Sequence, residues 1–458
     1  MDGLQDLPDE VRQYIRKLEE ENHFLKDTLL QLKQQMQQLQ ERVTYLERKL
    51  KAYENPHTPS SLQRFKNHTG GAIPQGKRGA PPGHHGATRP QQEPDEIIPV
   101  TMDTCPQCGS YLGAATQIES RVIEDLPPPQ KIRVTRYDLH HYHCSGCGTH
   151  ITAMHQDCPH TGNFGVRLMT HITLMKYRQR CVLRRIEESL WNQHQFPITP
   201  KGIHDILLRV GDALVPEYQR QQYEVRHAPY RYTDETSSSV MGENHWLWLS
   251  RSDTNTVSLL IHPSRGRQAL YQLLGEEITG VDVNDGWSSY RSLPETQRCW
   301  AHLLREVDAG TDLSDHEQQF SEKIHRRYDA LKAFIGKDPP MTQCIRQKTH
   351  WDKELATLTD RYYEIPETRT KAQYLKNGLG SWHTCLLHPG MQPTNNLAEQ
   401  AIREHVIQRK IIGCFRSERG AENYSHIASV LATWRLQGKS VSEKLENLLR
   451  QELCLSQS

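Results

Sequence analysis

The sequence lacks any long apolar run, because no stretch approaches the roughly 18 apolar residues that a membrane-spanning helix requires. Its first residues, Met1-Asp2-Gly3, lack the positive charge and apolar segment of a signal peptide. The net charge is only +1. Positive and negative residues are nevertheless unevenly distributed along the chain, so this value does not exclude a polyanionic partner. We therefore expect a protein that stays in the cytoplasm.

A disulfide framework is also missing, although the chain has eleven cysteines. Four of them form two Cys-x-x-Cys pairs, Cys105 with Cys108 and Cys144 with Cys147, each followed by glycine. Two such knuckles in a reducing compartment are typical of a structural Zn²⁺, since four thiolates leave no open position for catalysis. Alternation predicts strands at 121–124 and 131–137. Residues 98–160 are therefore expected to form a zinc ribbon.

Residues 55–92 contain no aspartate or glutamate, whereas basic residues such as Lys77 and Arg78 are present among many glycines and prolines. Such a composition cannot bury a core, so 55–97 is expected to be a basic linker that is disordered when free. It either lies along DNA phosphates or serves only as a spacer.

Residues 1–54 carry a heptad pattern typical of a coiled coil. Leucine fills every d position from 18 to 46, and Asn22 at an a position is the kind of polar residue that fixes register and partner number. We expect a homodimer through a two-stranded coil. The alternative is a long helix that packs on its own chain.

Residues 161–222 are predicted to be helical and basic. Arg184 and Arg185 belong to a cluster of cations, and Thr199-Pro200 is an N-cap followed by proline at the first helical position, just before Lys201. Helix, turn and capped helix suit a helix-turn-helix-like DNA-binding region. A helical hairpin that only packs is equally compatible with the pattern.

Three acidic residues have the setting of a phosphoryl-transfer site. Asp234 and Asp285 stand at expected strand ends, and Glu399 stands on an expected helix. Carboxylates bind Mg²⁺ or Mn²⁺, and a metal pair stabilises both the attacking and the leaving oxygen at a phosphodiester. Alternation turns Glu235 and Asp282 away from such a site. Taken singly, each acid also has an ordinary structural explanation.

Around these acids the pattern is three strands, a helix and a fourth strand. The segments are 231–236, 246–250, 257–262, 269–274 and 280–283. This order resembles the ribonuclease-H-like fold, whose first and fourth strands are neighbours. Residues 223–450 are therefore expected to form a ribonuclease-H-like domain with an α-helical insertion at about 306–392. The chain as a whole is predicted to be a mixed, multidomain α/β protein.

The helix that carries Glu399 is predicted to begin with Thr394 as its cap. Asn395, Asn396 and Arg403 lie three or four residues from Glu399 and so share its face. Two amides, a carboxylate and a guanidinium suit contacts with metal and phosphate. The alternative is a plain surface ion pair between Glu399 and Arg403.

These motifs, with Cys299-Trp300-Ala301-His302 and Asp285-Gly286-x-x-x-Tyr290, resemble bacterial insertion-sequence transposases of the sixty-six family. The resemblance covers nearly the whole chain. It implies a Mg²⁺- or Mn²⁺-dependent DNA transposase in which Asp234, Asp285 and Glu399 hold the metal. His302 is implied as a further catalytic residue.

The resemblance implies that water nicks the transposon ends and that the freed 3′-OH attacks target DNA. Its partners are then double-stranded DNA, a second copy of the chain and companion proteins of the element, in a nucleoid-associated cytoplasmic setting. Further candidates for DNA contact are Arg305, Asn396, Arg403 and Lys410. Two alternatives are a non-catalytic, dimeric, zinc-containing DNA-binding regulator and a metal-dependent nuclease.

Overall fold

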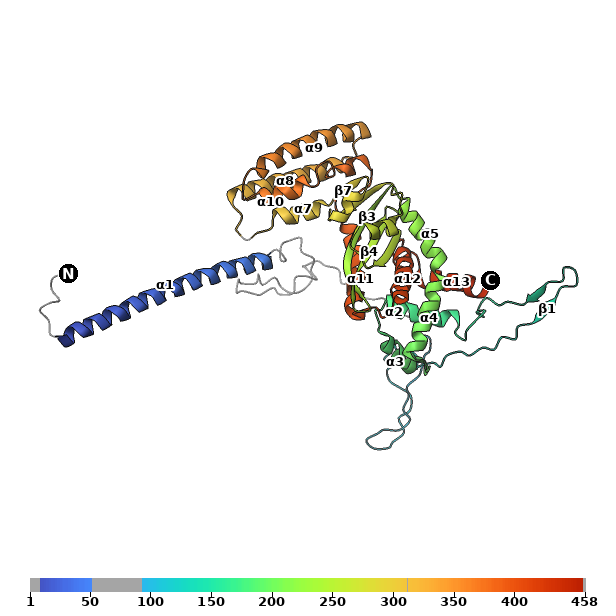
Figure 1. Cartoon of the computed structure of the whole chain (residues 1–458). Helices are drawn as coiled ribbons and strands as arrows, with labels where there is room; N and C mark the ends of the chain where they lie inside the picture. The colour runs from blue at the N-terminus through green and yellow to red at the C-terminus, as the bar shows by residue number, and fades with distance from the viewer. Residues whose placement is uncertain (1–8, 52–92, 311, 456–458) are drawn as a thin grey trace. The chain divides into compact units, whose positions relative to one another are not determined.

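The structure is a computed structural model that describes residues 9–51, 93–310 and 312–455. The described residues belong to two compact units (Figure 1). One takes in 136–187 and 199–455 as well as the N-terminal helix, and the other takes in 93–135 and 188–198. Lys77, Arg78 and most of the predicted linker lie outside the described residues. None of the described helices combines the length and apolarity that crossing a membrane demands.

The N-terminal helix α1 (Asp9–Lys51) is continuous over 43 residues. Its apolar seam is uncovered, because Leu25, Leu32 and Leu39 are each about 60% exposed (63%, 58% and 63%). Asn22 is exposed as well. The helix agrees with the heptad pattern, whereas pairing with a second copy stays a prediction.

The cysteine-rich region has fewer strands than predicted. A short hairpin, β1 (His141–His143) with β2 (His150–Thr152), flanks the second Cys-x-x-Cys pair. The predicted strands at 121–124 and 131–137 are wrong, since neither segment has strand structure. Between them stand three consecutive prolines, 127–129, which have no N–H to donate to a strand ladder.

A five-stranded mixed sheet forms the centre of the larger unit (Figure 1). Its strands are β3 (Tyr230–Val240), β4 (Glu243–Ser252), β5 (Val257–His262), β6 (Val281–Asn284) and β7 (Thr296–Arg298). Their order is β5-β4-β3-β6-β7, in which β3, β4 and β5 are antiparallel while β6 and β7 run parallel to β3. The predicted adjacency of the first and fourth strands is confirmed.

Helices from distant parts of the sequence cover this sheet. Trp248 of β4 packs in an apolar cluster with α5 (Val215–Arg226) and α6 (Arg267–Leu274). The edge strand β5 meets α12 (Glu418–Leu436), where Ser429 and Thr433 accept hydrogen bonds from backbone N–H groups of β5 at 2.8 and 2.9 Å. These hydroxyls satisfy an edge that would otherwise be open to pairing.

The predicted helical region contains α2 (Val166–Tyr177), α3 (Leu183–His194), α4 (Pro200–Ala213) and α5. Thr199 caps α4 by accepting a hydrogen bond from the N–H of Gly202, as its sequence predicts. The apolar face of α4, which includes Ile203 and Val210, is buried, and α4 packs against α2 and α12. This part of the helical region is therefore packed into the larger unit, where α12 joins it to the central sheet.

The segment between β7 and the helix carrying Glu399 is helical, as predicted. It contains α7 (Trp300–Val307), α8 (Asp315–Ile335), α9 (Met341–Tyr363) and α10 (Arg369–Lys376). The ring of Tyr328 on α8 stacks on Trp300 of α7 with 5.6 Å between centroids. The last described elements are α11 (Asn396–Ile412), α12, α13 (Val441–Arg450) and the short helices η1 (Ser288–Ser292), η2 (Thr384–Leu387) and η3 (Gln451–Leu455).

Candidate active site

Strand register places Asp234 and Asp285 level with each other. In the parallel pair of β3 and β6, Tyr232 is the partner of Val283. Asp234 lies two residues beyond Tyr232, and Asp285 lies two residues beyond Val283. Asp285 is the first residue after β6, which ends at Asn284. Side chains repeat every two residues along extended backbone, so continuing this register puts both carboxylates on the same side of the sheet.

The first turn of α11 is fixed beside this pair of strands. The side-chain amide of Asn395 donates to the carbonyl of Thr233 at 2.9 Å, one residue before Asp234. The backbone N–H of Asn395 donates to Cys299 Sγ at 3.1 Å, and Arg251 of β4 donates to the carbonyl of Leu397 at 3.1 Å. These contacts bring the first turn of α11, which carries Glu399, beside the part of β3 that carries Asp234. Asp234 lies within β3 and not at a strand end as predicted, because β3 continues to Val240.

The predicted cap of α11 is wrong, because the N-cap residue is Asn395 and not Thr394. Asn395 makes no side-chain cap, since its amide is bound to β3 instead. Its Oδ1 atom is buried without a hydrogen-bond partner in the described structure. Asn395 therefore serves to join a helix to a strand.

Negative charge is concentrated at this site. Burial raises the pKa of Asp234 well above its ordinary value of 3.8, and Glu235, Asp285 and Glu399 raise it further. Asp285 and Glu399 are therefore close enough to Asp234 for their charges to act on it. A divalent cation would remove this repulsion, so the donor set fits a hard metal ion.

The partner of Glu399 comes from α7. Arg305 donates to Glu399 Oε1 at 2.9 Å, and His302 Nδ1 lies 3.7 Å from the same oxygen. Arg403, the alternative partner suggested by sequence spacing, is exposed. Burial and Arg305 together lower the pKa of His302, which favours a neutral imidazole beside Glu399.

In the described part of the chain, one group of three candidate ligands lies within 4.8 Å of one another, formed by Cys299, His302 and Glu399. Cys299 is a poor metal ligand here, because burial raises the pKa of its thiol to about 11. Its sulfur already accepts the N–H of Asn395. Cys299 therefore joins α7 and α11. Asp234, Asp285 and Glu399 do not form such a group among the described residues, and their role as metal ligands stays a prediction.

Glu235 and Asp282 both point away from this cluster, as strand alternation predicts. Glu235 pairs with Arg265 at 2.8 Å and accepts a short hydrogen bond from the hydroxyl of Tyr290. Asp282 is buried beside Arg231 in the interior of the sheet. The tyrosine of the Asp-Gly-x-x-x-Tyr motif is therefore a core residue that fixes Glu235.

The sequence analysis missed Arg298, which supports the loop after Asp285. Its guanidinium donates to the carbonyl of Gly286 at 3.2 Å and lies over the rings of Tyr374 and Trp382, 5.2 and 5.3 Å from their centroids. The hydroxyl of Tyr374 donates to the carbonyl of Asp285 at 3.1 Å. Nothing in the local sequence pattern marks these contacts, because the residues come from separate elements.

Gly286→Ala is expected to destabilise the fold by about 1–3 kcal/mol and to reduce activity strongly. Gly286 has φ +84°, and an added Cβ would lie 1.7 Å from the guanidinium carbon of Arg298. Gly242→Ala is the matched control, since Gly242 has φ +87° with no atom near an added Cβ. Chemical denaturation and an end-cleavage assay measure both variants. Equal losses in the two variants would mean that only the backbone conformation matters.

Family comparisons agree with this geometry. A family model described as Transposase IS66 family matches residues 161–423, which is more than half of the 458 residues. The chain belongs to the IS66 transposase family. A second family model, the zinc-finger binding domain of transposase IS66, matches residues 103–148. A search of curated proteins finds no match.

The IS66 zinc-finger domain spans both Cys-x-x-Cys pairs, which agrees with the predicted Zn²⁺. In each pair the glycine after the second cysteine has positive φ, +75° at Gly109 and +72° at Gly148. Each glycine donates its N–H to the carbonyl of the first cysteine of its pair at 2.8 Å. The pKa values of Cys108 and Cys147 are lowered by hydrogen bonds from Ser110 and Thr149. Each pair thus has the turn of a zinc knuckle.

The predicted DNA-contact residues in the described chain fall into two groups. The side chains of one group are exposed: Arg184, Arg185, Lys201, Asn396, Arg403 and Lys410. Lys201 in addition pairs with Asp205. Arg305 differs from these residues, because it lies in the acidic site as the partner of Glu399.

Other basic residues of the helical region have packing roles. Arg180 forms a bidentate pair with Glu404 of α11, with both contacts at 2.8 Å. Burial lowers the pKa of Lys176 and of Arg178. The cation cluster at 176–185 therefore serves partly to hold α11 in place.

Proposed function

We propose that this IS66-family transposase cleaves transposon ends and joins the freed 3′-OH to target DNA at Asp234, Asp285 and Glu399. The observation that carries this proposal is the pairing of β3 with β6, whose register sets Asp234 opposite Asp285. The first turn of α11 is hydrogen-bonded to β3 beside them. The strand order β5-β4-β3-β6-β7 supports assigning the domain to the ribonuclease-H-like fold.

The three carboxylates would hold Mg²⁺, or Mn²⁺ in its place. They fit because all are oxygen donors and because burial, together with the negative charges of Glu235, Asp285 and Glu399, raises the pKa of Asp234. Bound there, a metal pair stabilises the attacking and leaving oxygens of an in-line displacement.

The remaining residues would position the reacting groups. Arg305 neutralises Glu399, and its guanidinium is long enough to turn towards a phosphate oxygen once a cation takes over that role. His302, as a neutral imidazole, can exchange a proton with an incoming water or hydroxyl. Asn395 and Cys299 would act only by holding α11 and α7 together.

End binding and pairing would come from the other modules. The zinc-finger domain and the exposed arginines Arg184 and Arg185 would contact the transposon ends. The uncovered leucines of α1 would pair two copies, so that two active sites meet two ends. Companion proteins of the element remain candidate partners.

The test is a strand-transfer assay with a labelled duplex that carries the element's end. Mg²⁺-dependent joining to a target plasmid is expected. Cleavage without joining would instead support a nuclease. Binding to the end without cleavage would support a DNA-binding regulator.

The purified protein is expected to contain about one zinc ion per chain. This zinc should stay bound when the catalytic metal is removed, because four thiolates bind zinc far more tightly than carboxylates bind Mg²⁺. Metal analysis after gel filtration measures the zinc content. Cys105→Ser is expected to abolish it, whereas Cys344→Ser, a buried cysteine outside the knuckles, should leave it unchanged. Full zinc content in the Cys105→Ser variant would contradict a four-cysteine site.

A further inference from the structure

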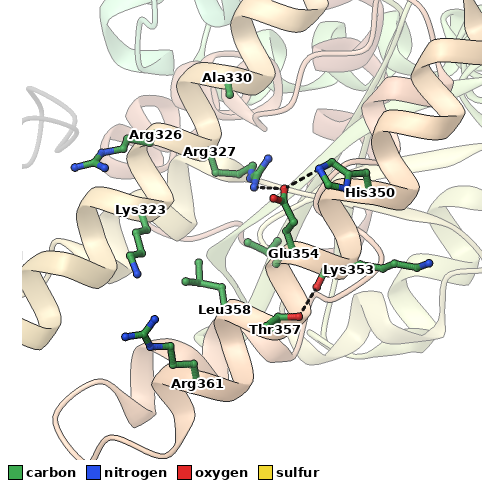
Figure 2. A pocket seen from close by; sticks show the side chains of 11 residues that line it. Lys323, Arg326, Arg327, Ala330, His350, Lys353, Glu354, Thr357, Leu358 and Arg361 are labelled. Atoms are coloured by element: carbon green, nitrogen blue, oxygen red, sulfur yellow. Dashed lines mark hydrogen bonds and ion pairs between the residues drawn. The ribbon is translucent and has the colours of Figure 1, made fainter.

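The helices α8 and α9 enclose a groove of about 650 Å³ that the mechanism above does not use. Its ionisable lining residues are Lys323, Arg326, Arg327, His350, Lys353, Glu354 and Arg361. Five permanent cations thus face one carboxylate, which gives a net charge of +4 with the histidine neutral. Figure 2 shows these side chains on the two facing helices.

The single carboxylate of the groove is already neutralised. Glu354 accepts a hydrogen bond from Arg327 at 2.5 Å and lies 3.6 Å from His350 Nε2 (Figure 2). Arg327 also lies over the ring of Trp351, 5.0 Å from its centroid. Glu354 therefore fixes Arg327, and Arg326 is paired with Glu322 at 3.0 Å, one turn earlier on α8. The cations of the groove that remain are Lys323, Lys353 and Arg361.

Lys323 and Arg361 converge on one buried ring. Lys323 Nζ lies 5.2 Å and the guanidinium carbon of Arg361 lies 5.9 Å from the centroid of Tyr362. Within the described residues, no carboxylate lies at ion-pair distance from Lys323, Lys353 or Arg361. Like charges held together without a counter-charge cost free energy, and a bound anion would remove that cost.

The groove has the length of a short stretch of nucleic-acid backbone. Lys353 and Arg361 are eight residues apart on α9, which at about 1.5 Å per residue is roughly 12 Å. Phosphates on one DNA strand rise about 3.4 Å each along the helix axis and lie farther apart along the winding backbone, so about two or three fit this length. Leu355 and Leu358 supply apolar lining, and Thr357 adds a hydroxyl to the cations that line the groove.

The groove is joined firmly to the active site. Tyr328 of α8 stacks on Trp300 at the start of α7, the helix that carries His302 and Arg305. Lys371 of α10 donates to the carbonyl of Val307 at the end of α7 at 2.9 Å. A strand held in the groove would therefore be held at a fixed distance from the acidic site.

We propose that this groove binds the phosphodiester backbone of the DNA on which the transposase acts, as a second anchoring site outside the acidic cluster. This proposal rests on the proposed function in one respect, namely that the ligand is DNA. Contacts with phosphates alone would contribute affinity without sequence preference.

The test measures equilibrium binding of the full-length protein to a duplex by fluorescence anisotropy at several salt concentrations. All variants also carry Asp234→Asn, so that binding is measured without chemistry. Lys323→Gln with Arg361→Gln is expected to make the slope of log K against log salt shallower by about 1.8, or about 0.9 per lost phosphate contact. Affinity at low salt should fall on the order of tenfold or more, equally for end and unrelated sequences.

Two controls separate charge from folding. Lys323→Arg with Arg361→Lys keeps both charges and should keep the slope, and Arg346→Gln removes an exposed charge of α9 outside the groove and should also keep it. An unchanged slope in the double glutamine variant would overturn the proposal. The same holds if that variant loses binding of polyglutamate but keeps its DNA affinity, because the groove would then serve an acidic protein. Failure of strand transfer in the wild type would count against the catalytic proposal and leave this binding test intact.

Discussion

Asp234→Asn is expected to lower end cleavage and strand transfer on the order of a thousandfold or more, with duplex binding retained. An amide supplies a neutral, weaker ligand in place of the carboxylate of Asp234, so the attacking and leaving oxygens would lose their stabilisation. The assay is the Mg²⁺-dependent strand transfer described above, with anisotropy as the measure of binding.

The same substitution should stabilise the metal-free protein. Because the folded-state pKa of Asp234 lies above its ordinary 3.8, the ionised carboxylate opposes folding once the pH rises above that value. The penalty grows until the pH passes the raised pKa. Asparagine removes it, so the gain in melting temperature should increase with pH and vanish towards pH 3.8. Added Mg²⁺ should raise the melting temperature of the wild type only.

The matched control is Asp253→Asn, an exposed aspartate in the turn between β4 and β5. It should leave activity and the effect of Mg²⁺ on melting unchanged. Cleavage by the Asp234→Asn variant within about tenfold of wild type would remove the basis for a carboxylate metal site.

Arg231→Met is expected to cost about 3–5 kcal/mol of unfolding free energy. Arg231 and Asp282 are both almost fully buried, with Arg231 Nε 3.5 Å from Asp282 Oδ2. Burial raises the pKa of Asp282 even though Arg231, Thr233 and Asn284 favour its charged form. Without the guanidinium, the carboxylate would remain in the sheet interior with only neutral hydrogen-bond donors.

Urea denaturation measures this loss, and a double variant tests its cause. Arg231→Met with Asp282→Leu removes both charges, so it should be more stable than Arg231→Met alone. Arg419→Gln breaks an exposed pair with Asp212 and should cost less than about 1 kcal/mol. If the double variant is as unstable as the single one, lost packing and not the unpaired charge is responsible.

Several features were accessible from sequence because they depend on near neighbours. The Thr199 cap, the knuckle glycines and the alternation that turns Glu235 away all follow from spacing within a few residues. The wrong strand prediction at 121–124 also came from a local pattern, because alternation of side chains takes no account of the prolines that follow. The adjacency of β3 and β6 was predicted from the order of strands and helix along the chain. That order predicts which strands are neighbours only because it resembles the order in a known fold.

Other features required partners far apart in the chain. Glu399 pairs with Arg305 of α7 and not with its helical neighbour Arg403. Asn395 was assigned to the metal-binding face, yet its amide ties α11 to β3. No spacing rule reaches across such separations, because the contact exists only after the sheet and helices have packed.

The sequence by itself determined the types of chemistry available: thiolates in knuckle spacing, three carboxylates on separate elements, and cations along α8 and α9. Only the tertiary structure decided which of these groups meet. Parallel pairing of β3 with β6 sets Asp234 opposite Asp285. The packing of α8 against α9 brings cations from both helices to the lining of one groove. Local backbone preferences fix elements within a few residues, whereas burial of their apolar faces decides which elements become neighbours.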